Sequence, residues 1–386
     1  MNAVVPKTAA EEALGLSLPN RRSEEWKWTD LRRLIAAPYG KQAVIAAEAE
    51  VDRLIAASPL AAVKAKRIVF INGRYDAKRS QLPQGTVAAP ASLADDTIVA
   101  IGGKLSAEGA NLVLEGNMDM PVEIIHVATT GPQRAMAHRH TVTVAAGGSA
   151  SLIETFVGEG DYLSNAVIEI NVGEGARLDR VKIEHESAKA THLAHSIVNL
   201  AKNAILRDFT LTSGAQLNRQ NGTYTFLGQG ADARVSGAYL LNGKQHADTR
   251  LVVDHAVPHC TSRELFQCVM DDTARGIFQG KVIVRPDAQK TDGKQSSHAL
   301  LLSEAAEFDA KPELEIYADD VVCGHGATAG DLNPDHMFYL KSRGIPEAQA
   351  KSLLIAAFVG EAFDTIEHDG IRDALTSYAE GWLARR

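Results

Sequence analysis

A short motif recurs along the middle of the chain, and this recurrence constrains the fold more than any other feature of the sequence. Each copy places a small residue after a turn and follows it with residues that alternate as in a β-strand. The alanines of four copies, spaced 26, 28 and 27 residues apart, are Ala150, Ala176, Ala204 and Ala231. One supersecondary unit per period is typical of stacked coils that contact only their neighbours. The spacing favours a β-solenoid, with an antiparallel β-sandwich as the alternative.

Composition agrees with an elongated repeat. The chain has 386 residues, more than one compact core usually holds, with 31 glycines and only 5% aromatic residues. The net charge of -8 and the scattered arginine pairs argue against a nucleic-acid partner. Three unevenly spaced cysteines do not form a disulfide framework, and neither a signal peptide nor an apolar stretch long enough to span a bilayer is visible. We therefore expect a cytoplasmic protein without a membrane segment.

Changes in residue composition and in the spacing of apolar residues divide the chain into four parts. Residues 1–65 are rich in Ala, Leu, Glu and Arg and are expected to be helical. Residues 66–120 form a mixed connecting segment, and residues 121–333, with short β-prone runs between glycines, form the expected β-helix core. Residues 334–386 return to helical spacing and are expected to form a C-terminal helical domain.

Two segments carry more specific expectations. The run Ser23–Leu34 has a serine suited to cap a helix and apolar residues at near-helical spacing. Trp26 and Trp28 within it could stack on a ligand, but we expect this segment to pack against the next part of the chain. In the C-terminal part a short helix is expected to stop at Gly344, and Pro346 suits the first turn of a second. The apolar stripe of that helix either closes the core of its own domain or docks a partner protein. Its residues are Ala348, Leu353, Leu354, Ala357, Phe358 and Phe363.

Familiar nucleotide-binding motifs are incomplete. The run Thr291–Ser296 is similar to a phosphate loop, but Ala288 replaces the first glycine and Gln295 replaces the residue that would hold magnesium. The pair of glycines at 228 and 230 lacks the third glycine of a dinucleotide fingerprint and the helix that should follow. We therefore expect no nucleotide site in this chain.

Two of the close pairs of histidines in the sequence are considered as sources of metal ligands. They are His138 with His140, and His255 with His259. Neither pair includes the glutamate of an H-E-x-x-H zinc site, and 13 histidines in a chain of this length form some close pairs by chance. Both pairs are therefore interpreted as structural.

A Cys-x-His pair lies in the glycine-rich stretch Tyr317–Gly330. Residues two apart on a strand point to the same face, so Cys323 and His325 present a thiol and an imidazole side by side. Both groups suit iron, zinc or copper, and Gly324 and Gly326 leave room for another body to approach. Metal and cluster sites generally take about four protein ligands, so this is half a site. The alternative is that both residues only pack.

Several longer stretches resemble the SufB/SufD family of iron-sulfur cluster assembly scaffolds. The short length, the Asn-Arg-Arg-x-Glu-x-Trp-Lys start and the Cys-x-His-Gly-Ala-Thr motif are closer to the SufD branch than to the longer SufB branch. The stretches that carry the resemblance are Asn20–Leu31, Gly276–Val284, Leu300–Ser303, Lys311–Thr328 and Phe338–Ile345.

The resemblance implies a right-handed parallel β-helix flanked by helical domains. It also implies a scaffold subunit that is not an enzyme: its β-helix pairs with a SufB-like subunit, and its C-terminal helical domain binds a SufC-like ATPase that supplies ATP hydrolysis. His325, and more weakly Cys323, would lie at the SufB interface and hold a transient iron-sulfur cluster shared between the two subunits. The isolated chain is expected to form a homodimer through the same edge.

Two other functions stay open from the residues alone. A β-solenoid also suits a carbohydrate-active enzyme, which would need acidic residues along one face; only Asp309, Asp319 and Asp320 hint at such a row. The third candidate is a purely structural homodimer without metal chemistry.

Overall fold

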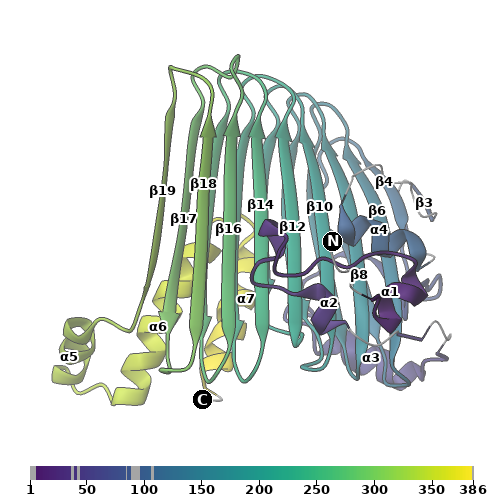
Figure 1. Ribbon diagram of the computed structural model, residues 1–386, viewed down its shortest axis with the longest axis horizontal. Coiled ribbons are helices and arrows are strands. Elements are labelled where there is room, and N and C mark those ends of the chain that lie inside the picture. The colour runs from purple at the N-terminus through teal and green to yellow at the C-terminus, as the bar shows by residue number, and fades with distance from the viewer. Residues whose placement is uncertain are drawn as a thin grey trace.

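The chain winds between two large sheets, so that successive strands alternate from one sheet to the other (Figure 1). The computed structural model describes residues 6–35, 39–40, 44–83, 85–87, 96–105 and 108–384. Apart from two short antiparallel strands at the N-terminal end, β2 (Arg74–Tyr75) and β3 (Gly85–Val87), the strand pairs within each sheet are parallel. The predicted parallel β-solenoid is confirmed, and the β-sandwich is excluded.

Each sheet contains one long strand from every turn of the solenoid. Sheet I has the strand order β19-β17-β15-β13-β11-β9-β7-β5-β1-β2, and sheet II has the order β18-β16-β14-β12-β10-β8-β6-β4-β3. The remaining strands of sheet I are β1 (Lys66–Ile71), β5 (Val122–Ala128), β7 (Ser149–Gly158), β9 (Arg177–His185), β11 (Ile205–Thr212), β13 (Asp232–Leu241), β15 (Thr261–Met270), β17 (Asp292–Leu301) and β19 (Val322–Gly330). Those of sheet II are β4 (Ala110–Leu114), β6 (Arg134–Val144), β8 (Tyr162–Val172), β10 (Thr191–Leu200), β12 (Leu217–Phe226), β14 (His246–His255), β16 (Arg275–Val284) and β18 (Glu307–Ile316).

The strand register explains the sequence repeat and corrects one copy of it. Ala176, Ala204 and Ala231 each lie one residue before a strand of sheet I and are buried. Ala150 instead lies inside β7, because the pairing of β7 with β9 places Gly148 at the position equivalent to Ala176. The recurring position therefore needs a small residue at a buried strand entry, and glycine fills it as well as alanine.

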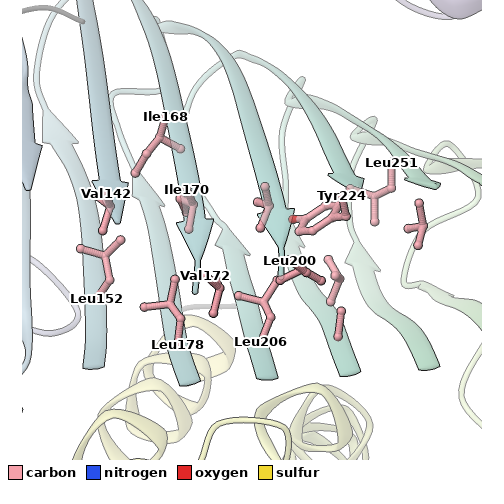
Figure 2. Packing of buried hydrophobic residues seen from close by; sticks show 14 of the residues in the cluster. Val142, Leu152, Ile168, Ile170, Val172, Leu178, Leu200, Leu206, Tyr224 and Leu251 are labelled. Carbon is pink, nitrogen blue, oxygen red and sulfur yellow. The ribbon is translucent and has the colours of Figure 1, made fainter. Parts of the chain in front are cut away.

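The space between the sheets is filled by side chains from alternate positions of both. Figure 2 shows a part of this apolar core, in which side chains from the two sheets meet. The residues labelled there are Val142, Leu152, Ile168, Ile170, Val172, Leu178, Leu200, Leu206, Tyr224 and Leu251. Repeating this packing at every turn lets the core grow along the solenoid axis.

The interior also contains buried charge near the middle of the solenoid. The guanidinium of Arg180 lies between the carboxylates of Glu154, at 2.7 Å, and Asp208, at 3.0 Å, and all three side chains are buried. Nearby, the imidazoles of His126 and His138 are in contact, with ring centroids 4.1 Å apart and ring planes tilted by 56°. Burial lowers the pKa of His138 to about 3, so this histidine is neutral in the folded protein. The pair His138 and His140 is therefore part of the core, as the sequence interpretation expected.

The N-terminal helices lie on the outer faces of the solenoid and are shorter than expected. They are α1 (Ala9–Leu14), the 3-10 helix η1 (Glu24–Trp26), α2 (Leu31–Leu34), α3 (Glu48–Ala56) and, later in the chain, α4 (Thr97–Lys104). The expected helix over Ser23–Leu34 is wrong in its middle, where the chain leaves the helical path to anchor on sheet II. Trp26 is buried 4.5 Å from the Arg219 guanidinium, and the Thr29 hydroxyl donates to Asp248 at 2.5 Å. The expectation that Trp26 packs against the next part is confirmed.

Of the C-terminal helices, the last two pack on the outer face of sheet I, whereas the first buries none of its residues. The three helices are α5 (Pro334–Ser342), α6 (Glu347–Phe363) and α7 (Asp369–Ala384), and Figure 1 shows α6 and α7 beside the middle strands. Ile355, Val359 and Phe363 of α6 join a cluster with sheet residues such as Phe209, whose ring centroid lies 5.5 Å from that of Phe363. The helices therefore do not close a core of their own. Of the predicted stripe, Phe363 is buried, whereas Leu353 is 47% exposed, because α6 is apolar on more than one side.

No helix in the described part of the chain is long and apolar enough to cross a membrane.

Candidate functional site

The two ends of the solenoid differ. At the N-terminal end, β2 and β3 add short antiparallel strands of two and three residues to the sheets. At the other end, among the described residues, β19 pairs only with β17 and β18 only with β16. Both final strands are therefore open edges with backbone groups available for another strand. Figure 1 shows them together at one end of the molecule.

Cys323 and His325 lie on β19, at this open end. In the parallel register Cys323 is opposite Gly293 of β17, and His325 is opposite Gln295. Each pair belongs to a column of positions that lie opposite one another on successive strands: on β15, Ser262 lies opposite Gly293, and Glu264 lies opposite Gln295. Cys323 packs against the core between the sheets, so both columns lie on the inner face of sheet I. His325, two residues further on, is exposed at the end of its column.

The glycines around the pair leave space on both sides. A Cβ atom added to Gly293 would lie 3.6 Å from the Cys323 sulfur, so the thiol sits against a bare backbone. A Cβ atom added to Gly324 or Gly326 would meet no described atom within 4 Å. These two glycines are not required by packing inside the chain, and they keep the open edge flat.

The environment of Cys323 favours the thiol over the thiolate. Burial raises the pKa of Cys323, the backbone N–H of Gly293 opposes this change, and nearby Asp292 and Glu264 add to it. A thiol must lose its proton to bind a metal, so metal binding here would release a proton. Cys323 is therefore a weaker nucleophile at neutral pH than an ordinary exposed thiol.

Two polar residues on the strands that continue sheet I from β19 were not predicted as site residues from the sequence. Gln295 and Glu264 are 2% and 3% exposed. Within the described residues the Gln295 Oε1 atom has no hydrogen-bond partner, and the Glu264 carboxyl group has the Ser262 hydroxyl nearby. Burial raises the pKa of Glu264 to about 8. The spacings of 31 and 30 residues from Glu264 to Gln295 to His325 are close to the solenoid period. A search for polar residues one solenoid period apart could therefore have linked Glu264 and Gln295 to His325 from the sequence.

Other residues considered from the sequence have structural surroundings. His255 stacks on Phe226 with ring centroids 4.3 Å apart, inside the solenoid. Asp309 forms an ion pair with Arg275 at 2.6 Å. The neighbouring acid Asp320 pairs separately, with Lys290. No group of three or more His, Cys, Asp or Glu side chains in the described ranges is arranged to hold a metal ion.

The two other cysteines are enclosed by the fold. Cys260 lies one residue before β15, the position that Ala231 occupies before β13, and Cys268 lies on the inner face of β15. Both are buried, and burial raises the pKa of each thiol. Their role is packing, as the sequence interpretation expected.

A second exposed feature lies beside the open end, on the C-terminal helices. Phe338 and Tyr339 of α5 are 73% and 56% exposed, and Leu353 of α6 is also exposed. Large apolar side chains gathered on short neighbouring helices are typical of a protein-binding surface.

Comparisons with known proteins agree with these features. Residues 126–358 match the family described as SUF system FeS cluster assembly, SufBD core domain. The chain is 31% identical to the iron-sulfur cluster assembly protein SufD of Escherichia coli over 94% of its own length and 88% of that protein. It is 32% identical to an iron-sulfur cluster assembly SufBD family protein of Mycobacterium leprae, over 94% of the chain and 90% of the relative. SufD of Bacillus subtilis is 26% identical over 73% of the chain and 66% of that protein.

Proposed function

Because this chain belongs to the SufBD family of iron-sulfur cluster assembly proteins, we propose that it is a non-catalytic scaffold subunit that holds part of a nascent cluster at its open end. In this proposal His325 supplies an imidazole ligand and Cys323 a second, weaker one. A SufB-like subunit pairs with the same edge and supplies the remaining ligands. The cluster is cargo, built and then released.

One observation carries the proposal: the Cys-x-His pair lies on the inner face of an edge strand that pairs on one side only. A strand of a second subunit can add to β19 through main-chain hydrogen bonds, as in other cases of β-augmentation. Such pairing would bring partner side chains next to His325 and enclose the pair. Half a ligand set is then sufficient, because the partner provides the other half. In isolation, the same open edge lets two copies of this chain pair with each other.

The C-terminal helices suit a role in binding a SufC-like ATPase. Phe338, Tyr339 and Leu353 form an apolar surface, separate from the open strands, on α5 and α6. ATP hydrolysis by that partner would move α6 and α7, which are packed on sheet I, and so transmit force to the solenoid. We assign this surface to residues 334–386, which we propose form the C-terminal functional part of the chain.

The proposal also extends to the handedness of the solenoid and to the cellular compartment. We infer a right-handed winding, the hand that parallel crossover connections usually have. The three cysteines are free thiols, as proteins of the reducing cytoplasm usually have, and we propose that the complex works there.

The test is reconstitution of the complex with its SufB-like and SufC-like partners. Wild type, His325→Ala, Cys323→Ala and a control, His298→Ala, are compared for iron and acid-labile sulfide retained per complex. His298 is the matched control, because it lies on β17 and bonds to Thr328, an outer-face contact near the same edge. Size-exclusion chromatography checks that all four complexes assemble equally.

We expect His325→Ala to lose most of the iron and sulfide, Cys323→Ala to lose a part, and His298→Ala to retain the wild-type load. Equal loading of all four complexes would overturn the proposed cluster site and leave this subunit as a structural brace.

A further inference from the structure

The side chain of Gln295 crosses the interior of the solenoid next to His325. Its Nε2 donates to the carbonyl oxygen of Gly280 on β16 at 3.2 Å. This bond determines the orientation of the amide, because the Gly280 carbonyl can only accept. The Oε1 atom is consequently an acceptor, and among the residues that the structure describes it has no donor.

A buried acceptor without a donor destabilises the protein, so its presence here needs a reason. The imidazole of His325 is a candidate donor, because His325 lies directly opposite Gln295 on the adjacent strand. Adjacent strands are about 4.8 Å apart, a span that a glutamine and a histidine side chain can bridge. In the free chain His325 is exposed, and a partner covering the open end would fold its ring inward.

We propose that Gln295 is a positioning residue for His325: its Oε1 accepts the N–H of one ring nitrogen when the open end is covered, which directs the other ring nitrogen toward the nascent cluster. This inference rests on the proposed function of His325. A metal-binding histidine usually donates its second ring N–H to an oxygen of the protein, which selects the tautomer and strengthens the ligand.

Glu264 extends the same column by one strand and supports the amide from behind. It lies opposite Gln295 on β15, where its carboxyl group is buried near the Ser262 hydroxyl. A carboxyl group that keeps its proton can donate to the second lone pair of the Gln295 Oε1 atom. Burial raises the pKa of Glu264 to about 8, so the proton is retained at neutral pH.

A substitution at Gly280 can displace the Gln295 amide without changing any residue of β17 or β19. A Cβ atom added to Gly280 would lie 2.1 Å from the Gln295 Oε1 atom and 2.9 Å from a ring carbon of Phe278, so both the amide and this ring would have to shift. Gly280→Ala should therefore displace the acceptor while leaving the sequences of β17 and β19 intact.

The experiment compares four changes in the reconstituted complex: Gln295→Leu, Gln295→Glu, Gly280→Ala and the control Gln267→Leu. Gln267 is a matched control because it is 1% exposed and also has an unpartnered Oε1 in the described part of the chain, but its Nε2 donates to Glu361 of α6, on the outer face. Retained iron and sulfide are measured at several pH values. The ring nitrogens of His325 are followed by ¹⁵N NMR, with His325→Ala used to assign the signals.

We expect Gln295→Leu and Gly280→Ala to lower iron retention about tenfold or more, the usual effect of removing such a partner. They should also change the tautomer of His325 in the complex. Gln295→Glu should restore retention, because a carboxyl group offers the same acceptor, and should change its pH profile. Gln267→Leu should retain the wild-type load.

Equal losses in Gln295→Leu and Gln267→Leu, or an unchanged His325 tautomer in Gln295→Leu, would overturn this inference. If His325→Ala loses iron and Gln295→Leu does not, the proposed function stands and only the role of Gln295 fails. If His325→Ala itself retains the wild-type load, the proposed function fails, and this inference fails with it.

Discussion

The buried carboxyl of Glu264 should make the protein less stable as the pH rises. Its pKa is about 8 in the folded chain, against an ordinary value of 4.5. Between these two values the unfolded chain releases a proton that the folded chain keeps, so the free energy of unfolding falls as pH increases. A tenfold change in an ionisation constant corresponds to about 1.4 kcal/mol, so the loss reaches about 3 kcal/mol at pH 7.

Glu264→Gln removes this loss, because an amide of the same shape cannot ionise. The variant should match wild type near pH 4.5 and exceed it by about 3 kcal/mol at pH 7. Urea unfolding of the isolated chain, followed by circular dichroism at pH 5, 6, 7 and 8, measures the difference. Glu304→Gln, an exposed change before β18, is the control and should show no trend. A stability difference that stays constant with pH, or the absence of a gain at pH 7, would refute the reasoning.

Three further predictions concern the core and the thiols. Arg180→Met removes the cation that pairs with the buried carboxylates of Glu154 and Asp208 and should lower the free energy of unfolding in urea by about 3–5 kcal/mol. His138→Phe should reduce the loss of stability that occurs as the pH falls from 6.5 to 3. In this range the unfolded chain binds a proton that the folded histidine does not bind. In acid titrations the reduction should reach about 1.4 kcal/mol per pH unit. Cys323 should be the one thiol alkylated by iodoacetamide in the folded chain, with a rate that still rises above pH 9, and mass spectrometry of the native and unfolded protein identifies the site.

The periodicity of the sequence was sufficient to predict the solenoid, because several successive turns bury a small residue at the same place. It was not sufficient to align every turn. Ala150 resembles the other recurring alanines, yet Gly148 occupies their position, and two small residues so close together cannot be ranked without the strand pairing. The helix expected over Ser23–Leu34 failed for a related reason: tertiary anchors at Trp26 and Thr29 outweighed local helical propensity.

The candidate site divides in the same way. The spacing of Cys323 and His325 was enough to place both on one face of a strand, since side chains alternate along any strand. That this face points inward, and that the strand is the last of its sheet, depended on the whole stack of turns. Gln295 and Glu264 became neighbours of His325 only through the parallel register, across separations of 30 and 61 residues.

The sequence by itself therefore determined the repeating unit, the pairing of thiol and imidazole, and the resemblance to a cluster assembly family. These features follow from local chemistry and short-range periodicity, which are readable along the chain. Only the tertiary structure decided which strand remained at the open edge of its sheet, which polar groups were buried without partners, and where the C-terminal helices packed. Those outcomes depend on which distant residues are brought into contact, and a buried oxygen such as that of Gln295 lacks a partner only because of what surrounds it.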